Sequence, residues 1–321
     1  MCALWNCNEQ TITEHSTTGS SISLSNIESK QNIEPIIVEK LDKNAGYYSY
    51  YFVFVAADEP LIIPFDFNWS PTKKGYNYEF KAWYGTEQDW PILYLNGDKK
   101  SKTIPQAPWE HKDTGGFQFD KKARTISIKI EKSPKLTLII PEKSEWIPMQ
   151  RQSNNKEIYA FQTSVKRNNE LINGWMIYER IRWDAASVKS FGDFSAFYWI
   201  PLVIDGDFYH FELHEGHGEQ TATKWYVADT TIKTEITNDF TVDVLEIVPD
   251  TKSGRKEIPK VIQVQAPTWG IDISLSSEGA QVGYGGQFPK GLAYYRQSIL
   301  KKTNYSKTDG YGMLELILEN N

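Results

Sequence analysis

Three of the five histidines lie within eight residues, in the segment 208–217 with the sequence FYHFELHEGH. Its alternation of apolar and polar residues predicts a β-strand, in which every second side chain lies on the same face. His210, Glu212 and His214 would then share one face. An imidazole beside a carboxylate can work as an acid–base pair, and the three side chains together can bind zinc or another divalent metal. The alternative interpretation is a polar outer face of an antiparallel sheet, opposite a buried apolar face.

Glu179 is a second candidate for chemistry, in the segment 174–184 with the sequence GWMIYERIRWD. On a strand, Glu179 shares a face with Ile177, Ile181 and Trp183. Desolvation by apolar and aromatic neighbours raises the pKa of a carboxyl group, and a general acid at neutral pH requires such a raised pKa. The alternative is that this carboxylate forms a salt bridge with a neighbouring arginine at the mouth of a barrel.

Aromatic residues are unusually frequent, because 18 Tyr, 15 Phe and 11 Trp make up 14% of the chain. Rings suit strands and also line pockets for apolar ligands, so most should belong to the core and some to a ligand site. The predicted catalytic residues are Glu179, Glu212 and His210. The predicted substrate-binding residues are Tyr178, Trp183, Tyr198, Trp199, Tyr226, Trp69 and Trp83.

Charge and cysteine content argue against several classes of partner. The net charge is −6 and basic residues form no run, so nucleic acid and anionic membranes are not expected partners. Cys2 and Cys7 cannot form a disulfide framework or, alone, a metal site. No motif for phosphate, haem or flavin is found, and no cofactor or metal is expected. The expected partner is a hydrophobic small molecule, bound by a monomer or homodimer.

The beginning of the sequence and its hydropathy also bear on localisation. The first residues contain no basic segment followed by an apolar run, so a secretory signal is not predicted. No stretch of about 20 apolar residues exists, so no membrane-spanning helix is expected. From these two observations we expect a cytoplasmic protein.

The elements that must position these side chains are almost all strands. In the first half, strands are predicted from Tyr47 to Ala56, from Gly75 to Tyr84, and around the isoleucines and leucines of 126–130 and 136–140. In the second half they are predicted over 158–165, 175–183, 196–204, 208–214, 223–228, 241–248, 260–265, 271–275, 293–301 and 311–318. Asn96-Gly97 and Asp205-Gly206 are hairpin-turn signals. One short helix is predicted over 184–190. Many short strands at regular spacing indicate an all-β barrel or sandwich.

Two polar stretches divide the chain. Residues 8–32 are rich in Ser, Thr, Asn, Gln and Glu, which predicts a flexible tail or a loosely docked strand. A second polar interval, 150–157, marks the expected junction between two domains. The predicted organisation is therefore a flexible N-terminal segment (1–33), an N-terminal β domain (34–155) and a C-terminal β domain (156–321).

The order of motifs in the second half resembles a known family. Gly174-Trp175 leads into the 179–183 segment, Phe197-Tyr198-Trp199 and the His210–His214 strand follow, and the chain closes on Gly310-Tyr311-Gly312-Met313-Leu314-Glu315-Leu316. These motifs are similar to those of the two-domain lipocalin-like (calycin) group that includes the carotenoid 1,2-hydratases (hydroxyneurosporene synthases), kievitone hydratase and the fungal lipocalin-like Diels–Alderases. The similarity covers about 150 residues. The acidic motif of the group after the Gly-Trp strand is replaced here by Tyr-Glu-Arg-Ile-Arg-Trp.

The resemblance implies two tandem lipocalin-like antiparallel β-barrel or sandwich domains with very little helix. It also implies cofactor-free chemistry on a long apolar substrate of secondary metabolism, an isoprenoid or a polyketide, by hydration, cyclisation or pericyclic closure. Glu179 would supply the general acid. The alternative is a non-catalytic lipocalin-like carrier of an apolar small molecule, because both functions require the same aromatic lining.

Overall fold

The structure is a computed structural model. It describes residues 45–72, 75–84, 93–101, 117–120, 123–128, 135–141, 147–148, 156–184, 195–216, 219–250, 255–278, 294–303 and 309–318. The predicted N-terminal segment 1–33 lies outside the described residues. So does the helix predicted over 184–190, except for Asp184, which ends a strand.

Antiparallel strands account for nearly all of the described residues. They are β1 (Ala45–Ala56), β2 (Ile62–Thr72), β3 (Gly75–Tyr84), β4 (Leu93–Ser101), β5 (Phe117–Asp120), β6 (Thr125–Ile128), β7 (Leu136–Ile139), β8 (Ile147–Pro148), β9 (Lys156–Arg167), β10 (Glu170–Asp184), β11 (Ala196–Ile204), β12 (Asp207–Glu215), β13 (Glu219–Ala228), β14 (Thr231–Thr237), β15 (Thr241–Val248), β16 (Ile258–Ala266), β17 (Ile271–Glu278), β18 (Tyr294–Lys302) and β19 (Gly310–Leu318). Within the described segments, helix is limited to the 3₁₀ helix η2 (Pro267–Trp269). The predicted all-β class with very little helix is confirmed.

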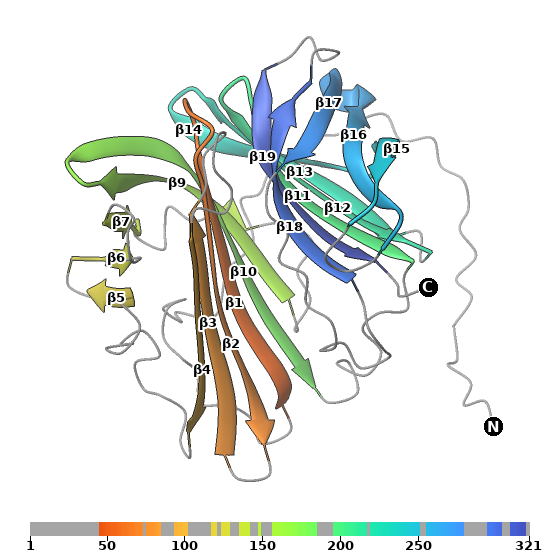
Figure 1. Ribbon diagram of the computed structural model, residues 1–321. Coiled ribbons are helices and arrows are strands. Elements are labelled where there is room, and N and C mark those ends of the chain that lie inside the picture. The colour runs from red at the N-terminus through yellow and green to blue at the C-terminus, as the bar shows by residue number, and fades with distance from the viewer. Residues whose placement is uncertain are drawn as a thin grey trace, which may run out of the picture. The chain divides into compact units, whose positions relative to one another are not determined.

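The strands form two sheets, and each sheet curls into a half-barrel (Figure 1). The first has ten strands in the order β4-β3-β2-β1-β10-β9-β7-β6-β5, with β8 pairing on β9. The second has nine strands in the order β14-β13-β12-β11-β19-β18-β17-β16-β15. Most neighbours in each sheet are also neighbours in the sequence, which is typical of the antiparallel meander predicted from the regular strand spacing.

The chain passes from one sheet to the other between Asp184 and Ala196. The domain boundary predicted at residues 155 and 156 precedes β9 and β10, which pair with the first sheet: β10 lies between β1 and β9. The strand pairing therefore groups residues 156–184 with the N-terminal half of the chain. The division into domains stays a prediction.

Side chains from both sheets form one buried cluster, which we call the inter-sheet layer. Alternation directs odd-numbered residues of β1, β10, β11 and β19 into it, together with even-numbered Phe208 of β12. The layer comprises Tyr51, Val53, Val55, Ile62, Ile158, Ala160, Trp175, Ile177, Phe197, Trp199, Val203, Phe208, Trp225, Ile299, Met313 and Ile317. A separate core fills the second half-barrel, and Tyr198, Ile200, Leu202 and Phe211 belong to it.

Specific contacts join the two sheets across this layer. The Trp175 indole N–H donates a hydrogen bond to the Gly206 carbonyl (3.3 Å) in the β11–β12 turn, and its ring stacks on Phe208 with centroids 5.7 Å apart. The Tyr311 hydroxyl of β19 donates to the Ala56 carbonyl of β1. The turn predicted at Asp205-Gly206 is confirmed, with both residues at positive φ.

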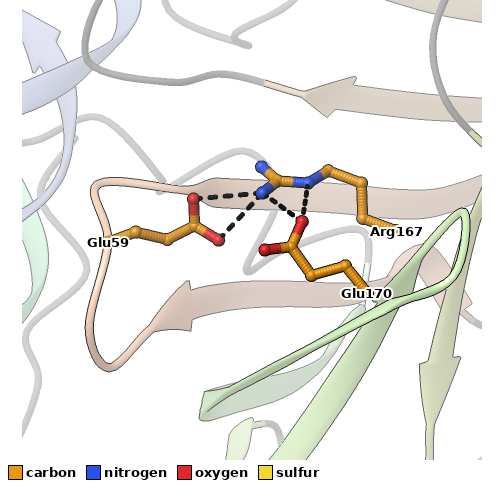
Figure 2. Close-up of polar contacts among 3 residues, drawn as sticks. All are labelled: Glu59, Arg167 and Glu170. Atoms are coloured by element: carbon orange, nitrogen blue, oxygen red, sulfur yellow. Dashed lines mark hydrogen bonds and ion pairs between the residues drawn. The ribbon is translucent and has the colours of Figure 1, made fainter.

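A cluster of charged side chains holds the β9–β10 hairpin against the β1–β2 connection. Figure 2 shows Arg167 between two carboxylates. Its guanidinium donates to Glu170 (2.7 Å) and forms an ion pair with Glu59 (3.3 Å). Arg167 is largely buried whereas Glu170 is exposed, so the contact with Glu59 is the one that connects separate parts of the first sheet.

Candidate functional site

Glu179 lies on the face of β10 that carries Trp175 and Ile177 of the inter-sheet layer. On β10 it stands between Tyr51 of β1 and Ile158 of β9 in the strand register, and only 5% of its surface is exposed. Residues opposite one another in this way have Cβ atoms about 4.5–5.5 Å apart. Arg180 lies on the other face of β10 and forms its ion pair with Glu157 of β9.

His210 approaches the same layer from the second sheet. It is fully buried on β12, on the face that carries Phe208. The Trp199 ring meets the imidazole edge-on, with centroids 4.9 Å apart at 64°. Thr223 of β13 is its cross-strand neighbour. The interpretation of this face as an exposed polar surface is thus wrong at His210, because the face packs between the sheets.

The face of β12 leads from a partly exposed end to this buried position. The side chains of His214 and Glu212 are 21% and 15% exposed, whereas His210 is 0% exposed. His214 Nε2 lies 2.9 Å from Glu212 Oε1, and the His214 ring meets Phe197 edge-on at 4.8 Å. The strand therefore connects the surface with the interior of the layer through a run of polar side chains.

Two aromatic rings lie at the centre of the site. Tyr51 from the first sheet and Trp199 from the second have ring centroids 5.1 Å apart, and the Tyr51 hydroxyl points to Met313 Sδ (3.9 Å). Glu179 neighbours Tyr51, while Glu212 and Glu315 flank Trp199 on β12 and β19. Carboxylates from both sheets thus occupy register positions beside the paired rings.

Two residues of this site, Tyr51 and Glu315, are not among the catalytic or substrate-binding residues predicted from the sequence. Tyr51 lies in an apolar run that predicts only a buried strand, and Glu315 lies in the closing Gly-x-Gly-x-Leu-Glu-Leu motif. The motif itself was a usable signal, because its alternation places Glu315 on the face of Met313 and Ile317.

Other predicted substrate contacts lie elsewhere. Tyr198 belongs to the core of the second half-barrel, where burial and the nearby charge of Glu215 raise the pKa of its hydroxyl. Tyr178 lies on the face of β10 opposite Glu179, with its ring 4.5 Å from that of Phe52. Tyr226 lies under the ammonium of Lys224 at 4.7 Å. These three tyrosines are not brought together with Glu179.

Trp183, Trp69 and Trp83 lie in β10, β2 and β3, but their side chains fall outside the described part of the structure. Within the described segments, no group of three or more His, Cys, Asp or Glu side chains is placed to hold a metal ion. No helix in those segments is long and apolar enough to span a membrane.

Neither a family model nor a curated protein matches the sequence. The fold is similar to that of an AttH candidate from Nitrosomonas europaea, with TM-score 0.54 and 12% identity over 89% of this chain and 99% of that chain. Kievitone hydratase from Nectria haematococca (TM-score 0.47, 12% identity, 89% and 94% covered) and CghA with Sch210972 (0.44, 10%, 88% and 95%) also match.

The arrangement combines three features that bear on its chemistry. A largely buried carboxyl group can transfer a proton where water is scarce. The faces of Tyr51 and Trp199 can stabilise positive charge. A partly exposed histidine–glutamate pair lies at the outer end of the same face of β12.

Proposed function

We propose that this chain is a cofactor-free cyclase or hydratase that acts on a hydrophobic isoprenoid or polyketide of secondary metabolism. The observation that carries the proposal is the position of Glu179: a carboxyl group 5% exposed, beside Tyr51, in the layer where Tyr51 contacts Trp199. Such a group serves proton transfer to an apolar substrate better than an exposed carboxylate does, because competing water is excluded.

The proposed reaction begins with the protonated Glu179. Its O–H proton passes to one carbon of an alkene, the C=C π electrons form the new C–H bond, and the neighbouring carbon becomes cationic. A second alkene of the substrate then attacks the cation and closes a ring, or water adds and gives an alcohol. The final loss of a proton returns it to the Glu179 carboxylate, so the acid is regenerated.

The surrounding residues have separate parts in this scheme. Tyr51 and Trp199 face the reacting carbons and stabilise the cation through their π faces. The layer holds a flexible substrate folded, which lowers the entropic barrier to ring closure. Glu212 and His210 line the face of β12 along which the substrate reaches Glu179, and the Glu212–His214 pair positions water for hydration.

The test is incubation of the full-length protein with a lipophilic cell extract in D₂O, followed by LC–MS, with heat-denatured protein as the control. An isomer with one non-exchangeable deuterium indicates cyclisation after protonation of carbon. A product heavier by HDO, with one deuterium on carbon and a hydroxyl deuteron that has exchanged in the eluent, indicates hydration.

Other outcomes separate the remaining possibilities. An isomer without deuterium means pericyclic closure and removes Glu179 as a proton donor to carbon. A compound that is depleted only in proportion to protein, and recovered unchanged on denaturation, means that the chain is a carrier. Either result contradicts the proposed acid chemistry.

A further inference from the structure

Three hydrogen-bond donors on fully buried side chains of the second sheet have no partner within the described residues. They are the indole N–H groups of Trp199 and Trp225 and the hydroxyl of Thr223. All three side chains are almost fully inaccessible to solvent. Native proteins pair the large majority of buried polar side-chain atoms, so each exception requires an explanation.

The three donors belong to one neighbourhood around His210. Thr223 is the cross-strand neighbour of His210, and Trp225 is that of Phe208, the residue two positions before His210 on the same face. The Trp199 ring contacts the imidazole directly. A further unpartnered hydroxyl, that of Thr234, lies opposite Trp225 in the register of β13 and β14. These unpaired groups lie on one face of the sheet, on β11, β13 and β14 around His210 of β12.

The other face of the same sheet shows the usual behaviour. Ser277 of β17 and Ser298 of β18 are equally buried, yet their hydroxyl oxygens lie 2.6 Å apart and form a hydrogen bond. The hydroxyl groups of Ser277 and Ser298 thus pair with one another, whereas those of Thr223 and Thr234 have no partner within the described residues.

We propose that Trp199, Thr223 and Trp225 form a subsite for an acceptor oxygen of the ligand. An indole N–H can only donate, so two such groups select a carbonyl or a similar acceptor and disfavour a purely hydrocarbon chain. The inference rests on the proposed function and narrows its substrate class. The substrate carries a carbonyl group on an apolar skeleton, as oxygenated polyketides do, and the carbonyl lies beside His210 while the reacting carbons lie beside Glu179.

The test compares two probes of similar shape, 2-acetonaphthone and 2-isopropylnaphthalene, which differ in the acceptor oxygen. We expect the wild-type protein to bind the ketone about tenfold more tightly than the hydrocarbon in fluorescence titrations. Thr223→Val should remove most of this preference without changing the affinity for the hydrocarbon. Thr223→Ser, which retains the hydroxyl group, should keep the preference.

Thermal unfolding without probe supplies a second measurement. Thr223→Val should leave Tm unchanged or raise it, because the Thr223 hydroxyl forms no hydrogen bond with any residue that the structure describes. The matched control is Ser277→Ala, which breaks the hydrogen bond to Ser298 and should lower Tm. A fall in Tm for Thr223→Val as large as that for Ser277→Ala would show that the hydroxyl has a structural role and would overturn the proposal.

Equal affinity for both probes, or binding of neither, also overturns the subsite. This binding test does not require turnover. Glu179→Gln should therefore keep the preference for the ketone. If product formation proves independent of Glu179 while the preference for the ketone persists, that result would support the subsite and contradict the proposed acid chemistry.

Discussion

The ring of Tyr51 on β1 contacts the indole of Trp199 on β11, with centroids 5.1 Å apart and planes at 49°. These residues belong to different sheets, and the contact brings the surroundings of Glu179 and of His210 into one layer. Two segments that each suggested acid–base chemistry thereby become parts of a single candidate site.

The size of Trp199 should matter more to stability than the hydroxyl of Tyr51. Trp199→Ala removes a fully buried indole and leaves a cavity between the sheets, so we expect a loss of about 3–5 kcal/mol in the free energy of unfolding. Tyr51→Phe keeps the buried ring and removes one hydroxyl group, so it should cost less, about 1 kcal/mol. Urea denaturation measures both. Equal losses would contradict the packing described for the layer.

Gly312 should tolerate no side chain. A Cβ at this position would overlap the Pro201 carbonyl oxygen and approach the Leu202 Cα to 3.0 Å, because β19 and β11 lie very close together there. Gly312→Ala should therefore destabilise the protein by more than about 3 kcal/mol.

Gly270 is the matched control for Gly312. It has φ +66° and nothing within 4 Å of a Cβ, so Gly270→Ala should cost only about 1 kcal/mol of conformational strain. Chemical denaturation compares the two variants. A greater loss at Gly270 than at Gly312 would contradict the close approach of the two strands.

The β13–β14 hairpin offers a stabilising change. Asp229 and Thr230 both have positive φ, as a type I′ turn requires, and a β-branched residue is strained in that region. Thr230→Gly should raise the free energy of unfolding by about 1 kcal/mol. Thr231→Gly, one residue into β14, should lower it instead. A stabilising effect at Thr231 or none at Thr230 would mean that the turn has another conformation.

Stability at high pH should depend on Tyr198. Burial, followed by the charge of Glu215, raises the pKa of its hydroxyl above the ordinary value of 10.0. Below pH 10 both folded and unfolded Tyr198 are neutral, whereas above it only the unfolded form loses its proton. The contribution of this group is therefore fully present below pH 10 and is lost as the pH rises further.

Tyr198→Phe should consequently lose less stability than the wild type between pH 9.5 and 11.5. The measurement is the difference in unfolding free energy between the two proteins, followed by urea denaturation across this range. A difference that stays constant with pH would contradict the burial of the Tyr198 hydroxyl.

Strand positions could be predicted where short apolar or alternating runs, rich in β-branched and aromatic residues, stand between polar or turn-forming stretches. The segments predicted at 75–84, 196–204 and 241–248 coincide with β3, β11 and β15. β14 was missed, since its alternating sequence TIKTEIT is mostly polar. The turn predicted at Asn96-Gly97 is wrong: both residues lie within β4, paired with Lys81 and Phe80, where pairing with β3 overrides the turn preference.

The candidate site was only partly predictable. The sequence indicates that His210 and Glu212 share a face, and separately that Glu179 has apolar neighbours on its own face. It does not specify what covers either face, because this depends on packing between strands far apart in the chain. The complete burial of His210 and the contact between Tyr51 and Trp199 are therefore seen only in the structure.

The most direct test of the central claim is the turnover of Glu179→Gln on the substrate found by LC–MS, compared with Glu170→Gln. Both residues lie on β10, but Glu170 is exposed and its carboxylate forms an ion pair with Arg167 in the β9–β10 turn. The account predicts that Glu179→Gln lowers kcat at least about 10²-fold with ligand affinity nearly unchanged, whereas Glu170→Gln retains wild-type kcat. Equal turnover by Glu179→Gln and the wild type would contradict the assignment of Glu179 as the acid.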